Sequence, residues 1–190
     1  PISIRTELPA VLAPDDVNAL TTDEAVALLG HLFEHSPWIV EETWGQRPFA
    51  SRADLHRALV ATMRRAPVER QVALIRAHPD LVGGAALSGT LTRESTGEQA
   101  AAGLDAGALT AGEIAAFTRN NAAYRERFGF PFVICARENK KESIVAGFAS
   151  RLPNSRDEEI RTALREIEKI AWYRLADVVA GDDALAVVEE

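Results

Sequence analysis

The chain has 190 residues, 47% of them hydrophobic, so it can bury one sizeable core, and nothing in its length requires a second domain. Its net charge is −7 with basic residues scattered among acidic ones, which argues against a protein that follows nucleic-acid phosphates. The single cysteine, Cys135, excludes an intrachain disulfide and a zinc site of the multi-cysteine kind. We therefore expect one domain over residues 1–190 with a small-molecule partner and no nucleic acid.

The chain ends and the longest apolar runs bear on location. No uninterrupted apolar stretch approaches the roughly 20 residues that cross a bilayer. Residues 1–10 lack the basic and apolar regions of a signal peptide, and residues 184–190 carry no peroxisomal address. We therefore expect a cytoplasmic protein without a membrane partner.

The first two predicted helices lie in the N-terminal third of the chain. Thr21–Glu24 matches a capping box, which satisfies free N–H groups at a helix start, and apolar residues recur at helical spacing over residues 25–33. Pro37 ends this pattern. The second predicted helix covers residues 51–65, where leucines again recur at helical spacing.

The third predicted helix begins at Pro67 and ends near His78, because Pro79 disfavours helical backbone at the residue before it. This pattern places His78 at a helix end. Residues 83–92 are rich in Gly, Ala and Ser and predict a loop. Ser95–Glu98 then matches another capping box, which would begin a short helix.

The C-terminal half predicts three helices and one apolar segment. The first helix begins at the capping box Thr110–Glu113 and closes at Gly129, and the other two cover residues 141–152 and 157–179. Between them, residues 130–136 form a continuous apolar run that we expect to be extended. Because only this run favours a strand, the predicted fold class is all-α, a compact single-domain multi-helix bundle.

One short motif suggests a metal site. His31, Glu34 and His35 spell H-x-x-E-H, in which histidines four residues apart on a helix face could bind zinc with the glutamate as base. The same residues also fit a plain helix end before Pro37, with His35 partly buried. The motif therefore keeps a zinc-dependent hydrolase as an alternative function.

His78 and Glu98 form a second candidate site. A histidine titrates near neutral pH and can transfer protons, and a neighbouring carboxylate can orient its ring. Both residues also have structural interpretations, since His78 can cap helix carbonyls and Glu98 can belong to the capping box with Ser95. The sequence leaves both open, and it does not show that the two side chains meet.

Arg151 is the third candidate, in the last turn of a predicted helix before Pro153. An arginine there can interact favourably with the helix C-terminus. The alternative is a bidentate clamp on a carboxylate or a ureido oxygen of a ligand. A chain with a net charge of −7 needs such a local arginine or a set of backbone N–H groups if its ligand is an anion.

Taken together, these segments resemble the 2-oxo-4-hydroxy-4-carboxy-5-ureidoimidazoline (OHCU) decarboxylase family, which completes the conversion of urate to (S)-allantoin. The resemblance runs in order along nearly the whole chain. Each piece is modest, and the combination is specific. It rests on the segments Phe33–Trp38, Arg47–Phe49, Ala77–Leu81, Ser95–Asp105, Asn121–Glu138 and Arg151–Asn154.

The resemblance implies an all-helical homodimer that needs no metal and no organic cofactor. The family's catalytic histidine and glutamate match His78 and Glu98. Its substrate-binding positions match a larger set, namely Pro79, Ser95, Gln99, Phe132, Val133, Ile134, Cys135 and Arg151. The OHCU carboxylate lies on a carbon next to a C=N unit, so the ring can accept the electrons released with CO2 and no cofactor is required.

The implied activity divides the work between the residues. His78 and Glu98 handle protons at the hydroxyl and the reacting carbon, and the binding residues hold the ureido and ring groups. Besides the zinc hydrolase, a non-catalytic helical interaction module remains an alternative. Such a module would tolerate loss of His78 and Glu98 without catalytic consequence.

Overall fold

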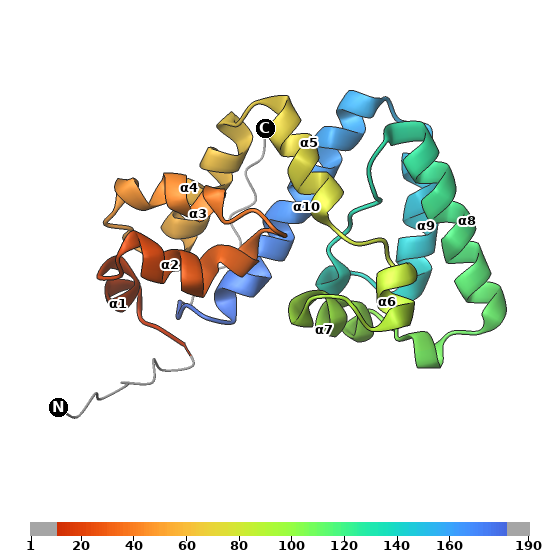
Figure 1. The fold of residues 1–190 in the computed structure, drawn as a ribbon, viewed down its shortest axis with the longest axis horizontal. Helices are drawn as coiled ribbons and strands as arrows, with labels where there is room; N and C mark the ends of the chain where they lie inside the picture. Colours follow the sequence, from red (N-terminus) through yellow and green to blue (C-terminus); the bar gives the residue numbers. More distant parts are fainter. Residues whose placement is uncertain (1–10, 182–190) are drawn as a thin grey trace. The chain divides into compact units, whose positions relative to one another are not determined.

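The computed structural model describes residues 11–181, which form helices and no named strand (Figure 1). This confirms the predicted all-α class. None of the helices in this range is long and apolar enough to cross a membrane. The end segments 1–10 and 184–190, on which the expected location rests, lie outside the described residues.

The helices separate into two compact units. One comprises residues 66–170, and the other the chain up to residue 65 together with residues from 171 onward. The expectation that residues 1–190 form one domain stays a prediction.

The first unit is built from four helices, two short 3-10 turns and the end of a fifth helix. They are α1 (Pro14–Asn18), α2 (Thr22–Leu29), η1 (Gly30–Leu32), α3 (Trp38–Thr43), η2 (Trp44–Gln46), α4 (Arg52–Arg65) and the last turns of α10 (Arg156–Ala176). The capping box of Thr21 and Glu24 is confirmed. The predicted extension of α2 to Phe33 is wrong, because the chain tightens into a 3-10 turn at Gly30 and becomes extended at Phe33.

The second unit contains the remaining helices. They are α5 (Val68–Ala77), α6 (Gly84–Ser88), α7 (Arg93–Ala101), η3 (Ala106–Ala108), α8 (Ala111–Phe128), η4 (Ala136–Glu138), α9 (Lys141–Arg151) and α10 up to residue 170. The capping box at Thr110 and the end at Gly129, whose φ is +78°, are confirmed. The loop predicted for residues 83–92 is wrong in part, because α6 forms within it.

The start of α7 differs from the prediction in a way that changes the site. Thr92, not Ser95, is the N-cap, and its hydroxyl accepts a hydrogen bond from the Ser95 N–H at 3.2 Å. The predicted capping box of Ser95 and Glu98 is therefore wrong, and both residues lie inside the helix. Ser95, Glu98 and Gln99 are spaced i, i+3 and i+4, so they share one helix face.

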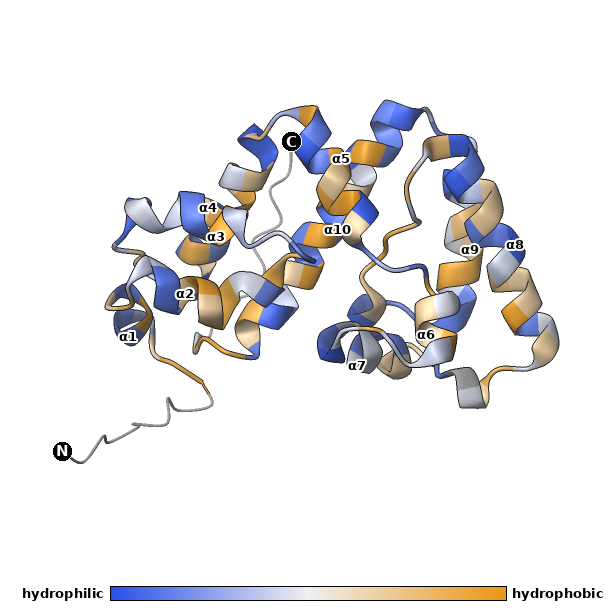
Figure 2. Cartoon of the chain, in the orientation of Figure 1, coloured by the Kyte–Doolittle hydropathy of each residue, from blue (hydrophilic) through white to orange (hydrophobic). Residues whose placement is uncertain are grey.

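Aromatic side chains form much of the core of the second unit. The Phe132 ring stacks on the Phe148 ring of α9 with centroids 4.1 Å apart, and Tyr124 of α8 meets Phe132 edge to face at 5.3 Å. Polar and apolar residues are mixed along α8 and α9, as amphipathic helices require (Figure 2). Residues 130–135 have no regular secondary structure, yet the rings of this segment are anchored in the core.

A buried ion pair stabilises the first unit and yields a prediction. Arg174 Nη1 lies 3.0 Å from Glu34 Oε2, and the two side chains are 2% and 4% exposed. Replacing Glu34 by alanine would leave the arginine buried without this carboxylate. We expect Glu34→Ala to lower the free energy of unfolding by about 3–5 kcal/mol in urea titrations.

The matched control is Glu41→Ala, because Glu41 is an exposed residue of α3. We expect that change to stay within about 0.5 kcal/mol of the parent. Equal effects of the two substitutions would contradict the importance of the buried pair.

Candidate active site

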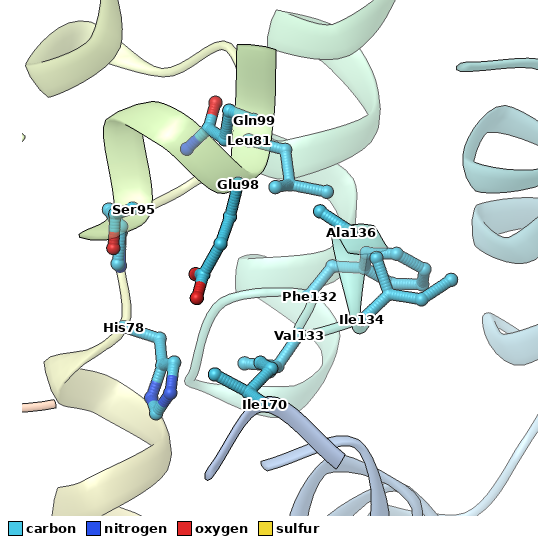
Figure 3. Close-up of a pocket in the computed structure, with 11 residues that line it drawn as sticks. His78, Leu81, Ser95, Glu98, Gln99, Phe132, Val133, Ile134, Ala136 and Ile170 are labelled. Atoms are coloured by element: carbon cyan, nitrogen blue, oxygen red, sulfur yellow. The ribbon is translucent and has the colours of Figure 1, made fainter. Parts of the chain in front are cut away.

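A cavity of about 380 Å³ lies within the second unit. Eight of the ten residues that the sequence predicts for the site line it. The full lining consists of His78, Pro79, Leu81, Ser95, Glu98, Gln99, Phe132, Val133, Ile134, Ala136 and Ile170. Figure 3 shows the His78 ring and the Glu98 carboxylate directed into the same space.

His78 is held at the C-cap of α5 in a defined chemical form. Its backbone N–H donates to the Ile75 carbonyl, and its ring Nδ1 lies 3.0 Å from the Leu74 carbonyl oxygen. A carbonyl oxygen only accepts, so Nδ1 carries the proton and the neutral ring keeps its lone pair on Nε2. His78 does cap a helix carbonyl, and that contact also gives the ring a basic nitrogen.

Helix α7 presents three polar side chains to the cavity. Ser95, Glu98 and Gln99 lie on one helix face and are only 5–8% exposed. The Gln99 Oε1 atom accepts a hydrogen bond from the Val82 N–H at 3.0 Å, so the amide NH2 group is the part of Gln99 that can donate to a ligand. The lining thus offers a hydroxyl, a carboxylate and an amide.

The segment after His78 is fixed by side chains of α7 and α8. Gln99 holds Val82, Asn121 Nδ2 donates to the Leu81 carbonyl at 2.8 Å, and Arg125 Nε contacts both Asp80 carboxylate oxygens at 2.9 and 3.0 Å. The bond to the Leu81 carbonyl explains why the buried face of α8, which is otherwise aromatic, contains the polar Asn121.

The contacts of Gln99 and Asn121 hold a strained stretch of backbone around Val82. Val82 has a φ of +52°, which is a genuine outlier for a β-branched residue. At Gly83, an added Cβ would lie 2.6 Å from the Asp80 Cβ, so only glycine fits there. Such strain persists where the surroundings over-determine the backbone, and here they keep the lining residues after His78 in place.

The segment Phe132–Ala136 forms the opposite wall of the cavity. Arg151 Nη1 donates to the Val133 carbonyl at 2.7 Å, and the Cys135 N–H donates to Glu166 Oε2 at 2.8 Å. None of the described residues hydrogen-bonds to the backbone of Ile134. The wall is therefore fixed on either side of Ile134, whose backbone donor and acceptor stay available to a ligand.

Two predicted binding residues do not line the cavity. Arg151 is 9% exposed, and its guanidinium binds Glu159, the Val133 carbonyl and the Tyr124 hydroxyl, while its charge lies 4.3 Å from the Phe132 ring centroid. Glu159 is fully buried, and Tyr124, whose pKa is raised by burial, bonds to its carboxylate. The network supports the cavity wall from behind.

Cys135 is the second predicted binding residue that does not line the cavity. It is fully buried, and burial raises its thiol pKa to about 12, so the thiol stays protonated and unreactive at neutral pH. Only its backbone takes part in holding the wall.

Three lining residues were not among the predicted ones. Leu81 follows the His78–Asp80 segment directly, and Ala136 ends the predicted apolar run. Ile170 lies one helical turn after Ile167 on the inward stripe of α10, so the helical period could have identified it.

The H-x-x-E-H motif lacks the helical geometry that zinc binding would need. Helix α2 ends at Leu29, His35 has a φ of +47°, and Glu34 is paired with Arg174. His31 and His35 therefore do not share a helix face. Across residues 11–181, no group of three or more His, Cys, Asp or Glu side chains is placed to hold a metal ion.

These observations define a class of protein. Its described part is all-α, with a small pocket in which a histidine and a carboxylate face the same space. Such a pair suits proton transfer to a small molecule, because imidazole and carboxylate side chains are the groups that most often transfer protons in enzymes.

Comparisons with known proteins identify the family. The family model for OHCU decarboxylase matches residues 18–176. An OHCU decarboxylase of Amia calva is 44% identical over 163 residues, covering 86% of this chain and 92% of that protein, and one of Haloferax volcanii is 40% identical, covering 87% and 95%. The chain therefore belongs to the OHCU decarboxylase family.

A solved structure supports the same assignment. The crystal structure of (S)-allantoin synthase superposes with a TM-score of 0.70 at 26% identity, over 93% of this chain and 56% of that one. The chain thus matches a little over half of that structure's length.

The tautomer of His78 is testable directly. We expect a long-range ¹H–¹⁵N spectrum at mildly alkaline pH to show a protonated Nδ1 and an unprotonated Nε2 for this ring, because Leu74 can only accept. Comparison with the spectrum of His78→Gln assigns the signal among the four histidines. A ring protonated at Nε2 would contradict the described geometry.

Proposed function

We propose that this chain decarboxylates OHCU to (S)-allantoin in urate degradation. The observation that carries the proposal is that His78 and Glu98 face one cavity of about 380 Å³, at the positions that the family resemblance assigns to catalysis. The names of its relatives support this substrate. The two relatives above are named OHCU decarboxylases, and the chain matches 92% and 95% of their length.

The reaction needs protons in the right places and no external electron acceptor. The bond between the carboxylate and its ring carbon breaks, CO2 leaves, and the electron pair forms a double bond to the neighbouring carbon as the C=N nitrogen takes a proton. The hydroxyl then loses its proton to form a carbonyl, and the neighbouring carbon gains a proton on one face. In sum, the substrate anion takes up one proton and releases CO2.

His78 and Glu98 are assigned to these proton transfers. The Nε2 lone pair of His78 can accept the hydroxyl proton, and the resulting imidazolium remains hydrogen-bonded to Leu74 through Nδ1. Glu98 lies across the same cavity on helix α7. General acid–base groups of this kind contribute about 10²–10⁴-fold to the rate.

The remaining lining groups are assigned to holding the substrate. The Ser95 hydroxyl, the Gln99 amide and the backbone of Ile134 supply donors and acceptors for the ring and the ureido group. We assign Arg151 to supporting the wall through the Val133 carbonyl in place of the substrate contact expected from the sequence. We expect the enzyme to work as a cytoplasmic homodimer without nucleic acid, metal or organic cofactor.

The function is tested by generating OHCU from urate with the two preceding enzymes and following its loss by absorbance. We expect the chain to accelerate the decay, and His78→Ala and Glu98→Gln each to reduce kcat/KM at least about 100-fold, because each removes a proton-transfer group. Circular dichroism and thermal melts check that both variants fold.

The matched control is His35→Asn, which removes an exposed histidine at a backbone conformation that asparagine tolerates. We expect its activity to stay within about twofold of the parent. Parent protein that leaves the spontaneous decay rate unchanged would refute the proposed function.

The zinc-hydrolase alternative is separated by metal removal. We expect protein dialysed against a chelator to keep its full OHCU activity, because the assigned steps use only His78, Glu98 and the substrate's own ring. Activity that is lost to the chelator and restored by zinc would contradict this and favour a metal site.

A further inference from the structure

A surface pocket of about 480 Å³ lies in the second unit, and the described residues that line it differ from those that line the cavity of His78. Its lining consists of Val68, Glu69, Val72, Arg76 and Arg156. Two of these five residues are arginines, although the chain has a net charge of −7. The pocket therefore carries a local positive charge, which attracts anions.

One hydrogen bond fixes each of the two guanidinium groups. Arg76 Nε donates to the Gly129 carbonyl at 2.9 Å. Arg156 Nε donates to the Phe128 carbonyl at 3.2 Å. These are consecutive carbonyls at the end of α8, which a helix leaves without internal partners. Neighbouring carbonyls thus hold both arginines at the same pocket.

The remaining N–H groups of both arginines are available to a ligand. An arginine has five N–H donors, and the bond from Nε uses one of them. Within residues 11–181, neither Arg76 nor Arg156 forms an ion pair with a carboxylate. The terminal edge of each guanidinium therefore presents two parallel N–H groups, the fork that binds the oxygens of an anion.

Glu69 is the acidic residue of the lining, and it does not neutralise the pair. It precedes Arg76 by seven residues on α5, which corresponds to about 10 Å along the helix axis. Val72 lies between them on the same helix face and is buried, whereas Val68 is 48% exposed. The pocket thus combines two cationic forks with an apolar part.

We infer that Arg76 and Arg156 form a binding site for a phosphate group, either of inorganic phosphate or of a small phosphate monoester. Two guanidinium charges match a dianion, and a phosphate has enough oxygens to engage both forks. A carboxylate has one charge and two oxygens, which one fork already satisfies. The apolar part of a monoester would contact Val68 and Val72. This site is separate from the proposed function.

The experiment titrates the full chain with inorganic phosphate at about pH 8, where phosphate is a dianion, and at constant ionic strength. The NMR signals of the arginine Nε–H groups report binding. We expect saturable shifts of the Arg76 and Arg156 signals with a Kd of about 1 mM. Arg76→Gln and Arg156→Gln each remove one fork, so each should raise the Kd at least about 10-fold.

Two further variants separate binding from folding. Arg119→Gln is the matched control, because Arg119 is exposed on α8 outside the pocket lining, and we expect a Kd within about twofold of the parent. Val68→Glu keeps both arginines and their backbone bonds and adds a negative charge at an exposed lining position. We expect it to raise the Kd about threefold or more, which tests the site even if the arginine variants do not fold.

Phenyl phosphate and benzoate distinguish the classes of ligand. A lower Kd for phenyl phosphate than for inorganic phosphate supports a monoester that contacts Val68 and Val72, and an equal or higher Kd supports inorganic phosphate. We expect benzoate to bind at least about 10-fold more weakly than phenyl phosphate, because it lacks the second charge. Equal Kd values for benzoate and phenyl phosphate would overturn the assignment to a phosphate group.

The inference fails if the parent shows no saturable shift. It also fails if folded Arg76→Gln and Arg156→Gln proteins keep the parent Kd, or if Val68→Glu does. None of these results changes the OHCU assay, so a chain that binds phosphate and lacks OHCU activity overturns only the proposed function.

Discussion

The hydrogen bond between His78 Nδ1 and the Leu74 carbonyl decides what this cavity can do. Pro79 ends α5, and the His78 ring then satisfies a carbonyl of its last turn. One contact therefore caps the helix, fixes the ring and leaves the Nε2 lone pair for chemistry. From the sequence, helix capping and proton transfer are alternative roles for this histidine. In the structure, the same hydrogen bond serves both.

The other parts of the site are held in place around that ring by side chains that hydrogen-bond to the backbone. Gln99 and Asn121 hold the segment after His78, and Arg151 and Glu166 hold the opposite wall. Glu98 faces the ring across the cavity from α7, whose first turn is fixed by Thr92. The cavity is thus pre-organised by buried polar contacts, which supports proton transfer because its groups need little rearrangement as charge develops.

The sequence predicts both ends of α8 well, because the capping box at Thr110, the apolar spacing and Gly129 agree. It places the start of α7 one turn too late, because Ser95 and Glu98 match a capping box, whereas the observed N-cap Thr92 has Ser95 at its N3 position. Family resemblance names eight of the lining residues, and it also names Arg151, which is paired with a buried glutamate behind the wall. An arginine at a helix end looks the same in the sequence whether it binds a ligand or such a glutamate. Local spacing carries no information about such long-range partners.

The central claim is that this cavity delivers a proton to one face of a decarboxylated intermediate. The most direct measurement is the circular dichroism of the allantoin that accumulates when OHCU decays in the presence of the chain. The account predicts an optically active product of the S hand that forms faster than the spontaneous reaction. Racemic allantoin at the spontaneous rate would contradict it.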